Sequence, residues 1–282
     1  MQWKGRRESS NVDDRRGITG KGLAVGGGVL GVIFVLAQFF LGDGDISSLQ
    51  QLLPQEQQQE MSVQEKAADD ERASFVKVVF ADTEDVWDKL FDNIGKIYQK
   101  PTLVLFRNST TSGCGTASAS SGPFYCPADQ QVYIDLSFAQ QLKDQFGATG
   151  DFALAYVVAH EVGHHVQDLL GITSKMAQLR QQVGETEYNK FSVRLELQAD
   201  FYAGLWAHYN QKMKNVIDAA DIQEALNAAN AIGDDNLQRQ YQGTVTPDAF
   251  THGTSEQRMY WFKKGYESGD FNEGNTFAAG SF

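Results

Sequence analysis

Apolar and polar positions divide the chain into stretches of different character. Residues 23–41 carry no charged side chain, and a helix of that length spans about 28 Å, close to the roughly 30 Å hydrocarbon core of a bilayer. Residues 42–73 are rich in Gln, Glu, Asp and Ser. We therefore expect a basic segment (1–22), a transmembrane helix (23–41), a polar linker (42–73) and one folded domain (74–282).

Periodicity within residues 74–282 predicts the elements of that domain. Apolar side chains recur at three- and four-residue spacing in the predicted helices, and short runs rich in β-branched and aromatic residues predict strands. The predicted helices cover residues 83–99, 151–170, 192–204, about 218–232 and about 255–267, and the predicted strands cover residues 102–106 and 131–136. This order indicates an α+β fold, mostly helical with a small sheet.

The stretch 151–170 has the clearest helical pattern. It contains no proline, Asp151 stands where it can cap the N-terminus, and Gly171 can end the helix in a left-handed conformation. Gly163 costs about 1 kcal/mol of helix propensity relative to Ala. We therefore expect a largely buried helix in which Gly163 lets another backbone or a substrate come close.

This helix carries the pattern His-Glu-x-x-His at His160, Glu161 and His164. Residues four apart lie on one helix face, so the two imidazoles can bind one zinc ion, and the neighbouring carboxylate can act as a general base. The alternative is a chance match. Three of the five histidines fall in this turn, however, and burying two imidazoles and a carboxylate without a metal would cost several kcal/mol. His165 points elsewhere, which suggests a surface residue or one that supports the site.

A catalytic zinc needs three protein ligands and an open coordination position. Glu196 is a better third candidate than His208 or His252, because it is a carboxylate in an apolar helical stretch. Asp200 lies four residues later, on the same face. There it can accept the second ring N–H of a ligand histidine, which fixes the tautomer. The alternative is that both acids are solvated.

His-Glu-x-x-His followed by Glu-x-x-x-Asp resembles the gluzincin peptidases. Residues 1–17, 195–204 and 251–258 more closely resemble the bacterial putative neutral zinc metallopeptidase family, and the likeness covers nearly the whole chain, including its membrane-anchor layout. It implies a zincin-like fold, one zinc ion per chain and hydrolysis of peptide bonds. Phe201 stands where we would expect a small residue or Cys, but this position does not affect the ligands.

His252 and Arg258 form a further candidate pair late in the chain. Thr254 and Gln257 make a capping box, which predicts that a helix begins just after His252. Some membrane-bound gluzincins carry a similar His-Pro-x-x-x-x-Arg stretch, and Gly253 replaces the Pro here. His252 can then stabilise the developing oxyanion with Arg258 positioning it. Alternatively, His252 only enters the helix and Arg258 forms a structural ion pair.

Charge places the chain relative to a membrane. Residues 1–22 carry six basic and three acidic side chains, whereas the whole chain has a net charge of −12. The positive-inside rule predicts a single-pass inner or plasma membrane protein with a cytoplasmic N-terminus and a periplasmic or extracellular domain. A cleaved signal peptide and a buried core helix are the alternatives. The Gly-x-x-x-Gly pair of Gly27 and Gly31 could let two transmembrane helices dimerise. The net negative charge of the chain argues against nucleic acid as a partner.

The only cysteines, Cys114 and Cys126, lie close together in a Gly/Ser-rich loop. In an exported domain this pair predicts a disulfide, and the alternative is that a cysteine binds zinc. The resemblance adds a role for the following chain. In zincin peptidases an edge strand beside the metal helix pairs with extended substrate, and residues 122–135 are the expected counterpart.

These expectations combine into one function. His160, His164 and Glu196 bind zinc, and Glu161 takes a proton from the attacking water and returns it to the leaving amine of a protein or peptide substrate. One alternative is a membrane-tethered interaction module whose zinc only braces the fold. Another is a zinc amidase that acts on cell-wall peptides.

Overall fold

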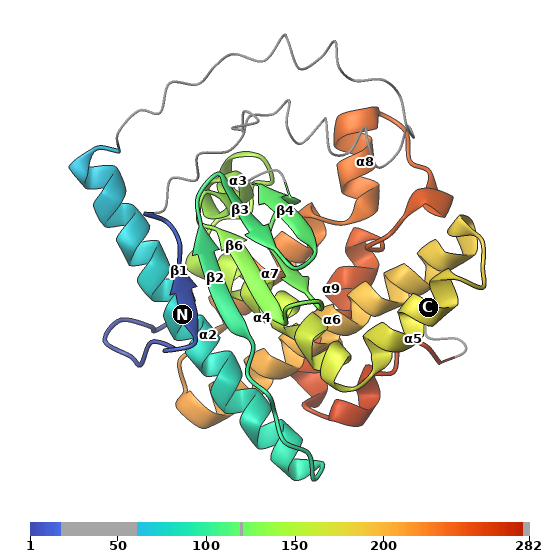
Figure 1. Ribbon diagram of the computed structural model, residues 1–282, viewed down its shortest axis with the longest axis horizontal. Coiled ribbons are helices and arrows are strands. Elements are labelled where there is room, and N and C mark those ends of the chain that lie inside the picture. The colour runs from blue at the N-terminus through green and yellow to red at the C-terminus, as the bar shows by residue number, and fades with distance from the viewer. Residues whose placement is uncertain (18–60, 119–120, 279–282) are drawn as a thin grey trace.

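The computed structural model describes residues 1–17, 61–118 and 121–278 (Figure 1). The expected transmembrane helix, its Gly27–Gly31 pair and most of the expected linker lie outside these residues. Within the described ranges, no helix combines the length and the apolar character that a membrane crossing requires. A mostly helical α+β architecture with a small sheet is confirmed.

The bounds of the elements follow the chain. The helices are α2 (Val63–Asn93), α3 (Phe138–Asp144), α4 (Asp151–Leu169), α5 (Ile172–Arg180), α6 (Glu185–Lys214), α7 (Ala219–Ala231), α8 (Asp234–Gln242) and α9 (Ser255–Ser268). The strands are β1 (Val12–Asp14), β2 (Thr102–Phe106), β3 (Ser109–Ser112), β4 (Gly115–Ser118), β5 (Phe124–Cys126) and β6 (Gln131–Asp135). Short 3-10 turns cover Pro247–Ala249 and Phe271–Gly274.

The main sheet has the strand order β1-β2-β6-β5. Strands β1, β2 and β6 are parallel, and β5 runs antiparallel to β6 at one edge. Leu103, Val104 and Leu105 of β2 are fully buried, as expected of a parallel strand covered on both faces. Strands β3 and β4 form a separate antiparallel hairpin. Both predicted strands are confirmed, because they coincide with β2 and β6 apart from one end residue.

Helix α4 lies at the centre of the helical layer (Figure 1). A Cβ atom built on Gly163 would lie 3.1 Å from the carbonyl oxygen of Ala199 on α6, so the expected close approach of a second backbone is confirmed. Gly171 is left-handed, as predicted, with φ of 76°. The expected cap at Asp151 is wrong, because Gly150 is the N-cap and Asp151 is the first helical residue.

Helix α2 differs at both ends from the predicted helix 83–99, and it begins before residue 74, where the folded domain was expected to start. It begins at Val63 after a capping box formed by Ser62 and Glu65, so the last part of the expected linker is helical. It ends at Asn93, and Gly95 with φ of 69° turns the chain away. Ile97, which lies within the predicted helix 83–99, is instead beyond the end of α2 and is 89% exposed.

Residues 1–17 also belong to the folded domain, so the division into a separate segment 1–22 is wrong for the part described. Val12 to Asp14 form β1, which pairs with β2 and extends the sheet. Figure 1 shows β1 lying beside α2. The physical reason is that the basic side chains of this segment pair with acidic side chains of α2, as with Arg6 and Asp82.

Candidate metal centre

Two helices bring the three predicted ligands together. His160 and His164 project from α4 and Glu196 from α6, and their ligand atoms all lie within 4.8 Å of one another. The Nε2 atoms of the two histidines are 3.2 Å apart. Glu196 Oε2 lies 3.1 Å from His160 Nε2, and Glu196 Oε1 lies 3.4 Å from His164 Nε2.

These separations fit a tetrahedral zinc ion. Ligand atoms about 2.0–2.1 Å from a zinc ion lie about 3.3 Å apart along the edges of the tetrahedron, which matches the 3.1, 3.2 and 3.4 Å found here. Two imidazole nitrogens that face each other at this distance repel unless a proton or a cation lies between them. The donor set of two nitrogens and one carboxylate therefore suits zinc and leaves a coordination position for water or substrate.

The second ring nitrogen of each ligand histidine donates to an acceptor. His160 Nδ1–H donates to Asp200 Oδ1 at 2.8 Å, and His164 Nδ1–H donates to Gln167 Oε1 at 2.9 Å. The Gln167 amide is held in turn by the Leu195 carbonyl at 2.7 Å. These bonds turn both Nε2 atoms toward the metal position. Sequence reasoning missed Gln167, although its place one turn after His164 was a usable signal.

Arg258 holds Asp200 in place. Its Nε donates to Asp200 Oδ2 at 2.9 Å, and its Nη2 donates to Asp200 Oδ1 at 3.0 Å and to the Tyr156 hydroxyl at 3.1 Å. Asp200 and Arg258 are 0% and 3% exposed. Burial would raise the pKa of Asp200, but Arg258 and His160 outweigh burial and lower it to about 2. Of the two alternatives for Arg258, the ion pair is therefore the one found: Arg258 pairs with Asp200, which supports the ligand His160.

Charge also shapes the titration of His160. Burial favours the neutral imidazole, but the hydrogen-bonded Asp200 and Glu196 carboxylates outweigh it and raise the pKa of His160 to about 10. The metal-free site therefore holds a proton at neutral pH. Zinc has to displace that proton, because only the neutral imidazole is a ligand.

We expect zinc affinity to increase as the pH rises from about 6 to about 9, by up to about tenfold per pH unit for each proton released. The sign follows from His160, which is protonated below a pKa of about 10 when metal is absent. Competition with a chelator, corrected for protonation of the chelator, measures the affinity. Titration calorimetry in two buffers of different ionisation enthalpy counts the protons. A pH-independent affinity with no proton release would contradict this prediction.

Glu161 lies between the ligands and the sheet. Its Oε2 accepts the backbone N–H of Tyr125 on β5 at 2.9 Å, and its side chain is buried. Burial raises the pKa of Glu161, and the nearby His160 and His164 only partly oppose this effect. A carboxylate with a raised pKa beside a metal position has the properties of a general base. Strand β5 is the edge strand next to α4, as the resemblance implied.

Tyr125 also ties the edge strand to α4 through its side chain. Its hydroxyl donates to Asp168 Oδ2 at 3.0 Å and lies 3.0 Å from His165 Nδ1. His165 Nε2–H donates to the Gln99 carbonyl at 2.6 Å. His165 is fully buried, so of the two alternatives for it the surface position is wrong, and it supports the strand beside Glu161 through Tyr125. Sequence alone gave no signal for Tyr125.

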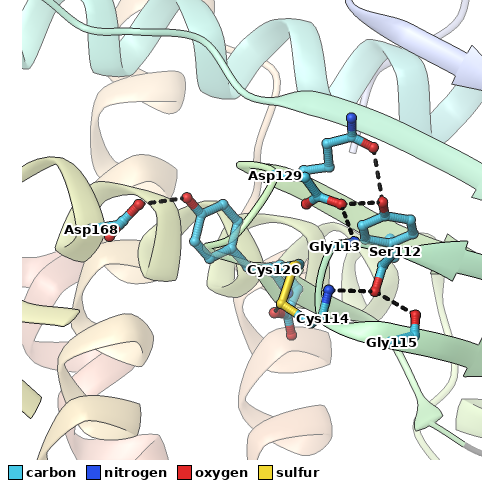
Figure 2. The surroundings of a disulfide bond; sticks show 11 residues. Ser112, Gly113, Cys114, Gly115, Cys126, Asp129 and Asp168 are labelled. Atoms are coloured by element: carbon cyan, nitrogen blue, oxygen red, sulfur yellow. Dashed lines mark hydrogen bonds between the residues drawn. A yellow bond between two sulfur atoms is a disulfide. The ribbon is translucent and has the colours of Figure 1, made fainter. Parts of the chain in front are cut away.

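The predicted disulfide between Cys114 and Cys126 is confirmed. Figure 2 shows the disulfide and the turn at Gly113, which is held by Asp129, whose Oδ2 accepts the Gly113 N–H at 2.6 Å. Cys126 directly follows Tyr125 on the edge strand. The bond therefore joins the hairpin of β3 and β4 to the strand that contacts Glu161, and neither sulfur is available as a zinc ligand.

The variant with both Cys114→Ser and Cys126→Ser is expected to lose about 2–3 kcal/mol of unfolding free energy, because the bond closes a loop with a sequence separation of 12. Urea unfolding of the oxidised parent and of the variant measures the difference. The reduced parent should match the variant, which separates the effect of the bond from that of the serines. Equal stability of all three forms would contradict this prediction.

His252 lies in the loop before α9, and the predicted capping box of Thr254 and Gln257 is confirmed. Asp234 holds this loop, because its Oδ2 accepts the backbone N–H groups of Thr251, His252 and Gly253 at 2.8, 2.6 and 3.0 Å. Its Oδ1 lies 3.1 Å from His252 Nδ1. The His252 side chain is half-exposed. Sequence reasoning missed Asp234, which is 18 residues away.

Comparisons with known proteins agree with this donor set. A family model described as putative neutral zinc metallopeptidase matches residues 1–277. The uncharacterized protein YpfJ of Escherichia coli (strain K12) is 51% identical over 288 residues, which cover 98% of this chain and 99% of that relative. The uncharacterized protein Rv2575 of Mycobacterium tuberculosis (strain ATCC 25618 / H37Rv) is 44% identical over 204 residues, covering 69% of this chain and 67% of that relative. No solved structure matches the chain.

Proposed function

Because the chain belongs to the putative neutral zinc metallopeptidase family, we propose that it is a zinc-dependent peptidase with a zincin-like site, attached to a membrane through residues 23–41. His160, His164 and Glu196 would hold one zinc ion per chain. When bound there, zinc would polarise a peptide carbonyl and activate a water molecule for attack. Protein or peptide chains are the proposed substrates.

The position of the Glu161 carboxylate beside the three ligands is the observation that carries this proposal. A zinc ion that only braces a fold usually takes four protein ligands and needs no base beside it. Here three ligands meet within the described residues, and a buried carboxylate lies next to them with a backbone N–H orienting it. The cost of burying such a carboxylate is explained if it takes part in chemistry.

Different residues around the metal position would carry out proton transfer, substrate binding and stabilisation of the developing charge. Glu161 accepts a proton from the attacking water and returns it to the leaving amine. In the described part of the chain no strand pairs with the outer edge of β5, where Glu161 already accepts the Tyr125 N–H; the other main-chain groups of this edge would pair with an extended substrate, which gives affinity without strong sequence preference. His252 would donate a hydrogen bond to the carbonyl oxygen as negative charge develops on it, and it lies near enough to Glu196 to help lower the pKa of that carboxylate. Asp234 positions His252 through the loop that carries both.

Metal removal and substrate choice test the proposal together. The full chain is assayed for bound zinc and then incubated with a mixture of unfolded proteins, and in parallel with cell-wall peptides, with new termini identified by mass spectrometry. We expect protein cleavage that stops on chelation and returns with added zinc. One zinc per chain without cleavage of either substrate would favour a bracing zinc in an interaction module. Cleavage of cell-wall peptides alone would favour an amidase.

A further inference from the structure

Residues 1–17, called the N-terminal segment below, dock on the domain along their whole length, although the proposed reaction does not use them. At one end the Trp3 ring packs edge-on against Phe75 of α2, with the ring centroids 5.5 Å apart. The Trp3 Nε1–H donates to Asp151 Oδ2, at the first residue of the metal-binding helix α4, at 3.3 Å. The segment therefore contacts both α2 and the helix that carries two ligands.

Two arginines of the segment reach carboxylates that are buried in the domain. Arg6 Nη2 lies 2.6 Å from Asp82 Oδ1, and Arg16 Nη1 lies 2.7 Å from Asp69 Oδ2. Asp82 and Asp69 are 2% and 3% exposed. Ion pairs at such sites need good geometry to offset the loss of hydration, so these contacts differ from the exposed pairs that contribute little to stability.

A third buried carboxylate depends entirely on the segment within the described part of the chain. Glu84 of α2 is 2% exposed. Its Oε1 accepts the Ser9 hydroxyl at 2.6 Å and the Asn11 amide at 2.7 Å, and its Oε2 accepts Arg7 Nη1 at 3.3 Å. Three donors from one short stretch of the segment converge on one carboxylate. This degree of complementarity indicates a specific docking site for residues 7–11.

Strand β1 completes the docking through the backbone. It pairs in parallel with β2, with Val12 opposite Leu103 and Asp14 opposite Leu105, and Val12 packs against the core. Without β1 the backbone groups along that edge of β2 would lack strand partners. The segment is therefore a component of the main sheet as well as a set of ion pairs.

This docking brings two sequence-based indicators of location into conflict. The basic side chains within residues 1–22 place the N-terminus in the cytoplasm, whereas the disulfide between Cys114 and Cys126 places the domain in an oxidising compartment. A segment paired with β2 and α2 cannot lie across a membrane from them. The segment's arginines at positions 6, 7, 15 and 16 also all pair with carboxylates in the folded chain, so their charge is compensated.

We propose that the N-terminal segment stays docked in the membrane-attached protein, so that it lies on the same side of the membrane as the domain of residues 61–278. This topology replaces the single crossing that the charge pattern predicts. The carboxylates of α2 and the edge of β2 would then stay covered by the chain's own N-terminal segment.

Labelling from one side of the membrane tests this topology in the full chain. Ser10→Cys in the segment and Lys96→Cys in the domain are both at exposed positions. Each variant is treated with a membrane-impermeant maleimide in sealed vesicles of one orientation, before and after detergent, and the parent chain corrects for its own two cysteines. We expect the two variants to react alike in the sealed vesicles. Labelling of only one of them before detergent would overturn the proposal.

A crosslink tests the docking contact itself. The Ser74 hydroxyl donates to the Glu8 carboxylate, so a short bifunctional maleimide should join the two thiols of the variant with Glu8→Cys and Ser74→Cys within intact membranes. A protease site introduced at residue 50 allows the crosslinked halves to be recognised after cleavage, and the two single variants serve as controls. Crosslinking in membranes at the level found in detergent supports the proposal. A crosslink that forms in detergent but not in membranes contradicts it.

Discussion

Glu161→Gln is expected to bind zinc like the parent and to hydrolyse peptide bonds about 10²–10⁴-fold more slowly. The amide has nearly the shape of the carboxylate, and its oxygen can still accept the Tyr125 N–H that Glu161 Oε2 accepts at 2.9 Å. It cannot take a proton from water. The structure and the metal should therefore remain, while the proton transfer is lost.

Zinc content, unfolding temperature and kcat/KM on one cleaved peptide separate these effects. Glu187→Gln, on an exposed turn of α6 with its side chain 51% exposed, is the matched control and should keep parent activity. A Glu161→Gln protein that binds zinc and retains parent-level cleavage would exclude Glu161 as the general base. The three-ligand site would then require another source of proton transfer.

Arg258→Met is expected to lower the unfolding free energy by about 3–5 kcal/mol, because it leaves the buried Asp200 carboxylate without its cation. Zinc affinity should also fall by about 10–100-fold, since Asp200 would no longer hold His160 firmly. The effect has a defined pH dependence. Asp200 has a pKa lowered to about 2 when folded, so its contribution to stability is present above pH 4 and is lost as the pH falls toward 2.

Urea unfolding at several pH values and a zinc competition assay measure both effects. Arg239→Met, at an arginine with a 62% exposed side chain, should change stability by less than about 0.5 kcal/mol. The variant with both Asp200→Asn and Arg258→Met removes both charges, so it should recover part of the lost stability. If Arg258→Met alone is as stable as the parent, the buried pair does not hold the site together.

The ligand set could be predicted from the sequence because its parts are local. Two histidines four apart on one helix share a face by geometry, and Glu196 with Asp200 repeats that spacing on the second helix. The apolar side chains of α4, α7 and α9 also recur at clear helical spacing, because one side of each helix packs on the core, and this spacing predicts the three helices. These features depend on neighbours within one turn, and a single sequence displays them directly.

The rest depends on partners that are distant along the chain. The donors to Glu84 come from 73 to 77 positions away, and Tyr125 is 36 positions from Glu161. The first turns of α2 resemble a linker because acidic residues such as Asp69 occupy positions that apolar residues usually take, and arginines from another segment pair with them. A pattern of apolar positions cannot reveal a surface buried by ion pairs.

Gly163 also bears on how the ligand atoms are spaced. Because no side chain stands between α4 and Ala199, the two helices meet at backbone contact, and the three ligand atoms are spaced before any metal arrives. The spacing of 3.1–3.4 Å suits ligand bonds of about 2.0–2.1 Å, whereas calcium prefers about 2.3–2.6 Å. The absence of a side chain at position 163 thus lets α6 approach α4 closely enough for Glu196 to reach the two histidines.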